Sequence, residues 1–231
     1  MRVYEHERWK GVYVAELDDG SVRLATRNLV PGQRVYGERL ISYQGAEYRE
    51  WNAYRSKLAA ALLKGLEELP VKDGDRILYL GIASGTTASH ISDLIGKSGL
   101  IYGIEFSPRV IRDLMHVVTD RRNILPILAD ARIPERYRLI VGTVNGLYSD
   151  VAQPEQADIV VRNARFFLEE GGYLLLAIKA RSVDVTREPS EIYLGEMKRL
   201  VNGGFEIKDV VHLDPFDRDH AMVYAIFRGR S

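Results

Sequence analysis

A glycine-rich turn follows a short apolar segment in the stretch LYLGIASGTTASH, which occupies residues 78–90. Gly81 and Gly85 allow a bound molecule to approach the backbone closely, because they have no side chain in the way. Thr86 and Thr87 place hydroxyl and N–H groups at the start of the helix that follows, where polar ligands bind well. The turn therefore indicates a ligand held against backbone N–H groups, although a tight strand-to-helix connection without a ligand has the same residues.

Two carboxylates stand at the ends of the next two predicted strands. Glu105 closes the strand predicted over residues 99–106, about 20 residues beyond the turn, where an acid accepts hydrogen bonds from both hydroxyls of an adenosine ribose. Asp130 follows the next strand and could accept a bond from the adenine amino group, with the Ala131 N–H and the Phe106 ring beside the base. A dehydrogenase does not need this second acid, so the combination favours S-adenosylmethionine over NAD. A surface carboxylate at a strand end and an aspartate that caps a loop are the alternatives for these two acids.

The pattern of apolar residues predicts two domains. A hairpin over GVYVAEL and SVRLATRN and a further strand over RVYGERLISY (residues 34–43) predict a small antiparallel β domain over residues 1–51. Leucines then recur at helical spacing from Leu58 to Leu66, which indicates that the structure changes after Trp51. We place the second domain over residues 52–231.

The second domain reads as an α/β sheet. Helices are predicted between its apolar strands, which indicates a largely parallel sheet covered on both faces. The strands are predicted over residues 76–80, 99–106, 123–130, 138–145 and 173–179. Two last strands, over residues 205–213 and 221–228, are separated by a segment too short for a crossover helix, so they should pair antiparallel. A parallel sheet that ends in an antiparallel hairpin is the Rossmann-like methyltransferase layout.

Composition excludes several classes of function. The chain has 231 residues, 46% of them hydrophobic and 28% charged, which is ordinary for a globular protein. It contains no cysteine, which excludes disulfides, thiolate catalysis and zinc sites built on sulfur. Its five scattered histidines predict no metal site. No apolar stretch approaches the roughly 18 residues that span a bilayer, and no signal peptide is recognisable, so we expect a cytoplasmic protein without a membrane partner.

The charges of the chain cancel, with 32 basic and 32 acidic side chains. Neutralisation of phosphates supplies most of the non-specific affinity of proteins for nucleic acids. If the substrate is a nucleic acid, we therefore expect that this chain does not hold it by electrostatics alone.

Five segments resemble fibrillarin, the 2′-O-methyltransferase of box C/D ribonucleoproteins. They are YLGIASGTTASHISDLIG, IYGIEFSPR, DVAQPEQ, LAIKARSVD and PFDRDHAMV. The similarity extends from the N-terminal strands to the last predicted strand. The chain starts in its strand region without the Gly/Arg-rich extension of eukaryotic fibrillarins, so it resembles the archaeal form.

The resemblance implies a catalytic set of two lysines, an aspartate and a histidine. Matched motif by motif, these residues are Lys57, Asp150, Lys179 and His220. Topology supports two of them independently, because Asp150 and Lys179 end adjacent parallel strands, where open α/β sheets place their sites. Without the resemblance, Lys57 reads as a solvated residue of its helix. His212 is a second histidine in the same region, but it lies on an alternating strand and is expected to be a packing residue.

The glycine-rich turn, the two strand-end acids and the resemblance together predict a cofactor site for S-adenosylmethionine. Its residues are Gly81, Ala83, Gly85, Thr86, Thr87, Glu105, Phe106, Asp130, Ala131, Asp150, Val151, Ala152 and Gln153.

The resemblance also implies an activity and an assembly. The activity is transfer of a methyl group from S-adenosylmethionine to the ribose 2′-OH of ribosomal or transfer RNA. In this scheme Asp150 orients Lys179, which engages the hydroxyl, while Lys57 and His220 complete the hydrogen bonds and take up the proton. The implied partners are a Nop-domain scaffold protein, a kink-turn-binding ribosomal-type protein, a box C/D guide RNA and the target RNA. The alternatives are an NAD-dependent oxidoreductase, a non-catalytic scaffold with the same fold, and a methyltransferase for small molecules or proteins.

Overall fold

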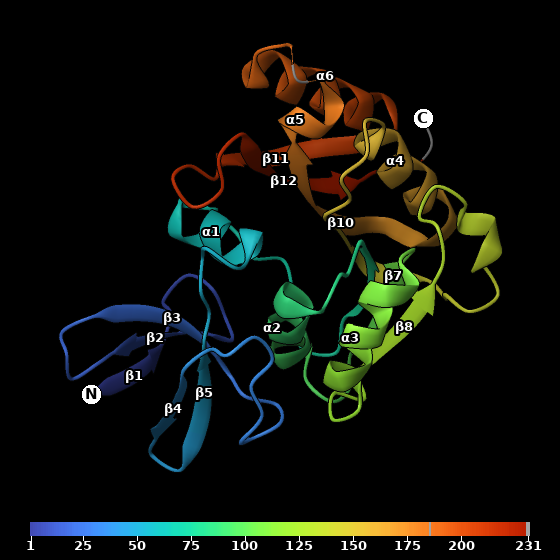
Figure 1. Ribbon diagram of the computed structural model, residues 1–231. Helices are drawn as coiled ribbons and strands as arrows, with labels where there is room; N and C mark the ends of the chain where they lie inside the picture. The colour runs from blue at the N-terminus through green and yellow to red at the C-terminus, as the bar shows by residue number, and fades with distance from the viewer. Residues whose placement is uncertain (185, 230–231) are drawn as a thin grey trace.

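The computed structural model describes residues 1–184 and 186–229, which form two β-sheets with helices around the second (Figure 1). The first sheet is antiparallel, with strand order β1-β2-β3-β5-β4. Its strands are β1 (Arg2–Glu5), β2 (Val12–Glu16), β3 (Val22–Arg27), β4 (Leu40–Tyr43) and β5 (Ala46–Glu50). All of them lie within the region predicted to be an antiparallel β domain.

The second sheet has strand order β11-β12-β10-β9-β6-β7-β8. Its strands are β6 (Arg76–Leu80), β7 (Leu100–Glu105), β8 (Ile124–Leu128), β9 (Val144–Ser149), β10 (Leu168–Lys179), β11 (Phe205–His212) and β12 (His220–Phe227). The strands from β10 through β9, β6 and β7 to β8 are parallel neighbours, whereas β12 pairs antiparallel with both β10 and β11. The predicted fold class, a methyltransferase sheet ending in an antiparallel hairpin, is confirmed.

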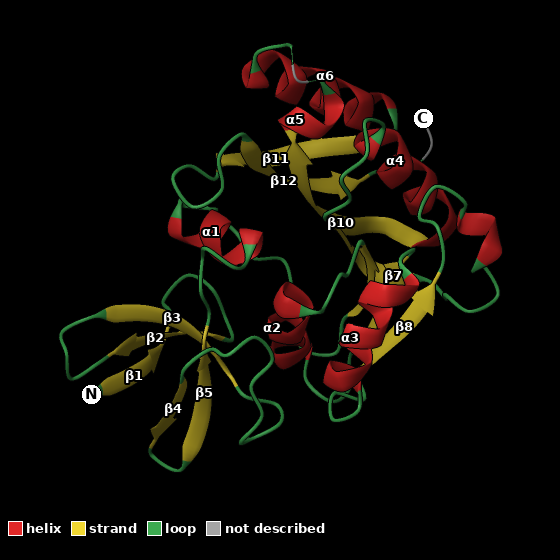
Figure 2. Ribbon diagram, viewed as in Figure 1, coloured by secondary structure: helices red, strands yellow, loops and turns green. Residues whose placement is uncertain are grey.

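Helices cover both faces of the second sheet (Figure 2). They are α1 (Lys57–Leu63), α2 (Thr86–Ile95), α3 (Pro108–Val118), the 3-10 turn η1 (Pro134–Arg136), α4 (Gln156–Phe167), α5 (Ala180–Val183) and α6 (Pro189–Asn202). Successive strand residues point to opposite faces, so Ile77 and Tyr79 of β6 pack with α1, α2 and α3, while Leu78 and Leu80 pack with α4 and α6. Within the described ranges, no helix combines the length and apolar character needed to cross a membrane.

The strand predicted over residues 138–145 is wrong. β9 begins only at Val144, and the apolar residues before it lie in an irregular segment where Leu139 is 93% exposed. The true strand is hard to recognise because Gly146 interrupts its apolar pattern. A Cβ atom at Gly146 would lie 2.2 Å from ring atom Cζ of Tyr173 on β10, so this position accommodates a neighbouring ring.

Two further strand boundaries differ from the prediction. Only the end of the strand predicted over residues 34–43 is regular, as β4, because the Glu38 carboxylate accepts hydrogen bonds from the Val35 and Tyr36 N–H groups and holds a loop there. β10 begins at Leu168, before the strand predicted over residues 173–179. The glycine pair at residues 171–172 coincides with a shift in register between β10 and β9.

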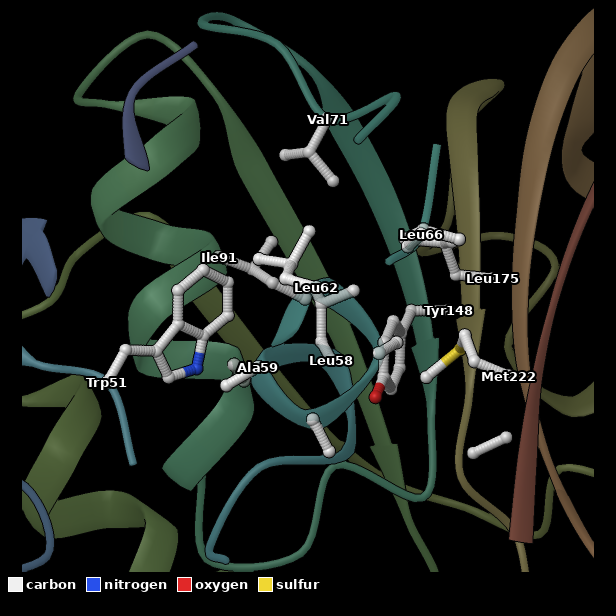
Figure 3. Close-up of a cluster of buried hydrophobic side chains, with 14 of the residues drawn as sticks. Trp51, Leu58, Ala59, Leu62, Leu66, Val71, Ile91, Tyr148, Leu175 and Met222 are labelled. Carbon is white, nitrogen blue, oxygen red and sulfur yellow. The ribbon is translucent and has the colours of Figure 1, made fainter. Parts of the chain in front are cut away.

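α1 lies in a buried cluster that both sheets share. In Figure 3, Leu58 and Leu62 of α1 lie between Trp51 and Ile91 on one side and Tyr148 on the other. The same cluster includes side chains from β2 and β3 of the first sheet and from β6, β9 and β10 of the second. Complete burial of a leucine contributes about 1.5–3 kcal/mol, so this packing fixes α1 against the second sheet. The domain boundary between residues 51 and 52 stays a prediction.

Candidate active site

A pocket of about 280 Å³ opens where β6, β7, β8 and β9 end, at the carboxyl edge of the parallel strands. The predicted cofactor residues that line it are Gly81, Ala83, Glu105, Phe106, Asp130, Ala131, Asp150, Val151, Ala152 and Gln153. A larger surface hollow of about 860 Å³ between α4 and α6 contains none of the predicted residues.

The turn after β6 forms one wall of the pocket. Gly81 has a φ of +74°, and a Cβ atom there would lie 3.1 Å from the Asp150 backbone oxygen, so glycine permits the close approach of two strand ends. Ala83, with a φ of +52°, donates its N–H to Glu105 Oε2 at 3.2 Å. The turn is therefore tied to the end of β7 by a side-chain carboxylate.

Glu105 and Phe106 form the next wall. Glu105 is 7% exposed, and its other carboxylate oxygen accepts a hydrogen bond from the Ser107 N–H at 2.9 Å. Two backbone donors thus hold the carboxylate in place while leaving further lone pairs on its oxygens. Phe106 is 71% exposed, which is unusual for a phenylalanine and provides an apolar surface beside the acid.

Asp130 is present at the pocket but is already engaged. The Arg132 guanidinium binds both of its carboxylate oxygens, at 2.7 to 3.1 Å, and the Arg132 N–H donates to one of them. Hydrogen bonds from this side chain lower the pKa of Asp130 below its usual value. The carboxylate is therefore ionised at neutral pH and can accept a further hydrogen bond only by sharing lone pairs with Arg132.

Three of the predicted cofactor residues do not line the pocket. Gly85 caps the N-terminus of α2 in a left-handed conformation, and a Cβ atom there would lie 2.8 Å from Leu114. Thr86 begins α2. Thr87 is buried, and its hydroxyl donates to Ser56 Oγ at 3.0 Å, so it faces α1 instead.

The predicted catalytic residues from three separate elements meet beside this pocket. Lys179 ends β10, and its Nζ lies 2.9 Å from Asp150 Oδ1 and 2.8 Å from the Asp150 backbone oxygen. Lys57 begins α1, and its Nζ lies 3.3 Å from Asp150 Oδ2. One carboxylate that also lines the pocket therefore holds two ammonium groups, and each of the three side chains is less than a fifth exposed.

His220 joins the cluster through a carboxylate that the sequence did not single out. It begins β12 and is the register partner of Lys179 on β10. Its Nδ1 lies 3.0 Å from Asp217 Oδ1, and Asp217 Oδ2 lies 3.4 Å from Lys57 Nζ. Its position three residues before His220 could have indicated Asp217 from the sequence. The same motif also contains Asp219, however, and the sequence does not distinguish the two.

The other histidine of this region has a different setting. His212 is exposed at the end of β11, where the edge of its ring contacts the Tyr193 ring at 5.2 Å between centroids. It was expected to be a packing residue, but it is not buried in the core.

The buried polar atoms that lack a hydrogen-bond partner gather at this site. Within the described residues they are Tyr148 Oη, Ser149 Oγ, Asp150 Oδ1 and Gln156 Nε2. Asp150 Oδ1 has Lys179 as an ion-pair partner, so its contact is electrostatic rather than an aligned hydrogen bond. Buried polar groups without partners are rare in folded proteins and are typical of places where a ligand or water completes the structure.

The residues of the pocket fit the adenosyl group of S-adenosylmethionine. Glu105 provides a buried, oriented acceptor for ribose hydroxyls, Phe106 an apolar face for the base, and Asp130 a second acceptor at the far strand end. Gly81 lines the same pocket and has no side chain to occupy it. The pocket also adjoins the lysine and aspartate cluster, since Asp150 belongs to both.

Known proteins match the chain over almost its whole length. The family model described as fibrillarin matches residues 3–229. A protein of Aeropyrum pernix named fibrillarin-like rRNA/tRNA 2′-O-methyltransferase is 76% identical over 228 residues, which cover 99% of this chain and 98% of that protein.

Solved structures agree with this match. A crystal structure of Aeropyrum pernix fibrillarin with natively bound S-adenosyl-L-methionine is 75% identical, with a TM-score of 0.93 and 98% of each chain covered. A fibrillarin in complex with Nop5p is 41% identical, with a TM-score of 0.83 over 93% of this chain and 97% of that one. The predicted relationship is therefore confirmed, and the chain belongs to the fibrillarin family.

Proposed function

We propose that this chain is the S-adenosylmethionine-dependent 2′-O-methyltransferase subunit of a box C/D guide-RNA ribonucleoprotein and acts on ribosomal and transfer RNA. The observation that carries the proposal is the cluster of Lys179, Asp150 and Lys57 beside a pocket that fits an adenosyl group. The names of similar proteins support the same reaction, since they describe rRNA/tRNA 2′-O-methyltransferases.

Lys179 is the residue that positions the ribose hydroxyl. S-adenosylmethionine, when bound, supplies an electrophilic methyl group on a positively charged sulfur. An ammonium group has three donors, and Lys179 gives one of them to the Asp150 backbone oxygen while it forms an ion pair with Asp150 Oδ1. A further donor remains for the ribose 2′-oxygen, which it holds in place for attack in line with the departing sulfur. Asp150 compensates the lysine charge, so that a second cation is tolerated nearby.

His220 is the base that accepts the proton of the ribose hydroxyl. Its Nδ1 lies 2.6 Å from the Arg218 carbonyl oxygen and 3.0 Å from Asp217 Oδ1, and both of these atoms are acceptors. Nδ1 must therefore carry the hydrogen, which leaves a lone pair on Nε2. An imidazole with a lone pair on Nε2 can take a proton from a hydroxyl.

The balanced charge of the chain supports its action within a ribonucleoprotein assembly. With 32 basic and 32 acidic side chains, the protein has little net attraction for RNA phosphates. We infer that a Nop-domain scaffold protein, a kink-turn-binding protein and a box C/D guide RNA present the target RNA to it. The complex of a 41% identical fibrillarin with Nop5p supports the first of these partners.

The test is a transfer assay with S-adenosylmethionine labelled on its methyl group. Guide RNA and target RNA are supplied with and without the two partner proteins, and a target with a 2′-deoxyribose at the specified nucleotide is the control. We expect label on a single ribose 2′-oxygen in the full assembly and none on the deoxy target. Label on a base or on protein, or equal transfer by the isolated chain, would contradict the proposal.

A further inference from the structure

A second carboxylate, Asp217, links the two ends of the predicted catalytic set. One of its oxygens lies 3.0 Å from His220 Nδ1 and the other lies 3.4 Å from Lys57 Nζ. Lys57 in turn lies 3.3 Å from Asp150, which contacts Lys179 at 2.9 Å. The five side chains thus form one row in which basic and acidic groups alternate.

The loop between β11 and β12 holds Asp217 in this position. The N–H groups of Phe216 and Asp217 both donate to the Leu213 carbonyl oxygen, at 2.9 and 3.1 Å, and close a turn. The Phe216 ring packs edge-on against Tyr54, near the start of α1, with 5.1 Å between ring centroids. The Asp217 side chain is 33% exposed and lies between Lys57 and His220, so contacts on both sides fix its position.

We propose that Asp217 is a positioning residue for methyl transfer, acting through His220 and Lys57. Its Oδ1 lies 3.0 Å from His220 Nδ1, whose hydrogen is bonded to the Arg218 carbonyl oxygen at 2.6 Å, so Asp217 acts on the ring through its negative charge while Nε2 stays free as the base. It also balances the charge of Lys57, which would otherwise lie between His220 and Lys179 with only Asp150 to compensate it. This inference rests on the proposed function, because it assigns a role within that reaction.

The reaction balances with Asp217 in this role. The bond from the ribose oxygen to the methyl carbon forms as the bond from that carbon to sulfur breaks, and the sulfur leaves as a neutral thioether. The hydroxyl proton passes to His220 Nε2, which makes the ring a cation. The Asp217 carboxylate, 3.0 Å from Nδ1, stabilises that cation by its negative charge. Asp217 itself keeps its charge throughout.

The test compares Asp217→Asn, Asp217→Ala and Asp217→Glu with the unmodified chain in the full guide-RNA assembly. Asparagine keeps the size of the side chain but removes the negative charge that faces His220 and Lys57. Glutamate keeps that charge. Asp214→Asn is the matched control, because Asp214 is an exposed carboxylate of the same loop. Transfer rate at saturating cofactor, cofactor affinity and thermal unfolding are measured for each protein.

We expect Asp217→Asn and Asp217→Ala to lower the transfer rate roughly 10- to 1,000-fold, a share of what a general base contributes, without weakening cofactor binding. Asp217→Glu should restore most of the lost rate, and Asp214→Asn should leave it unchanged. Asparagine and alanine variants that transfer at the unmodified rate would overturn the inference, as would a loss that glutamate does not rescue. If the unmodified chain transfers no methyl group to RNA, the proposed function fails instead.

Discussion

At the scale of single residues, the site depends on charges that compensate one another. Asp150 holds two lysines, and the polar atoms around it include Ser149 Oγ and Tyr148 Oη, which are buried without partners in the described chain. Burial raises the pKa of Tyr148 well above its usual value, with the nearby Tyr79 and Asp150 adding to the effect. This tyrosine therefore stays neutral and adds no further negative charge beside the aspartate.

The proposed role of Lys179 can be tested separately from cofactor binding. Lys179 does not line the pocket, and its contacts are to Asp150 and Gln156. We expect Lys179→Met to reduce methyl transfer by a factor on the order of 10² or more, because the ribose hydroxyl loses its donor, while cofactor affinity is kept. Transfer is measured in the full assembly and affinity by titration calorimetry, with Lys97→Met, an exposed lysine, as the control. A parallel loss of affinity would mean that Lys179 only maintains the structure.

Sequence patterns predicted part of this site, for a physical reason. Asp150 and Lys179 follow apolar strands, and parallel strands bring their ends to one edge, so their proximity could be expected. Asp217 could not be chosen in the same way, because Asp219 lies in the same motif. Only the loop geometry separates them, since Asp219 pairs with Arg181 at 3.0 Å, whereas Asp217 lies beside His220 and Lys57.

At the scale of elements, the ends of helices and strands position the candidate catalytic side chains. α1 has only seven residues, and Lys57 is the first of them. Ser56 caps this helix by accepting from the Ala59 N–H at 3.4 Å, and it also accepts from the Trp51 indole at 2.9 Å and from the Thr87 hydroxyl at 3.0 Å. One buried hydroxyl thus joins α1, α2 and the end of the first sheet directly beside Lys57.

Removal of this hydroxyl should affect both stability and turnover. We expect Ser56→Ala to lower the free energy of unfolding by about 1–3 kcal/mol, because the helix loses its cap and two buried donors lose their acceptor. Methyl transfer should fall as well, since the first turn of α1 carries Lys57. Denaturant unfolding and the transfer assay measure the two effects, with Ser21→Ala in the exposed hairpin turn as the control. A destabilised variant with full transfer would show that the cap does not set the position of Lys57.

The elements also show what sequence patterns leave out. The helix α1 was predicted because leucines recur at helical spacing, the later helices were predicted as connections between apolar strands, and the antiparallel hairpin was predicted from the short connection between its strands. β9 was misplaced because Gly146 accommodates Tyr173, a requirement that appears only once β9 and β10 are neighbours. Local patterns indicate which segments are regular, whereas packing between distant segments decides some of their ends.

At the scale of the whole molecule, a buried polar network joins the first sheet to α2. Arg49 of β5 contacts Glu38 at 2.6 Å and Asp93 of α2 at 2.9 Å, and Arg121 contacts the other oxygen of Asp93 at 2.6 Å. All four of these side chains are at most 2% exposed. Removing one partner of a buried ion pair typically costs about 3–5 kcal/mol, because the other charge stays buried. The first sheet therefore holds α2, the helix that begins at the glycine-rich turn. The four residues of this network are too far apart in sequence for a motif to reveal them.

His90 of α2 lies at the centre of this network and makes its stability depend on pH. The ring is fully buried, with Nδ1 2.8 Å from the Thr26 hydroxyl and Nε2 2.8 Å from the Tyr36 hydroxyl. Thr26 gives its own hydrogen to Asp93, so it accepts the Nδ1 hydrogen, while the single Tyr36 hydroxyl hydrogen is shared between Nε2 and the Glu50 carbonyl oxygen at 2.9 Å. Burial, with the charges of Arg49 and Arg121 adding to it, lowers the pKa of His90 well below its usual value.

The sign of the pH effect follows from this lowered pKa. In the unfolded chain a histidine titrates near pH 6.5, so below that pH the unfolded state binds a proton that the native state does not. The contribution is fully present above about pH 6.5 and is lost as the pH falls, with a limiting slope of about 1.4 kcal/mol per pH unit. We expect guanidinium unfolding between pH 5 and pH 7 to show this slope, and His90→Gln to remove it. His116→Gln, which changes an exposed histidine of α3, should leave the slope in place. If His90→Gln keeps the full slope, the pH dependence belongs to other groups and His90 is not held neutral by the interface between the first sheet and α2.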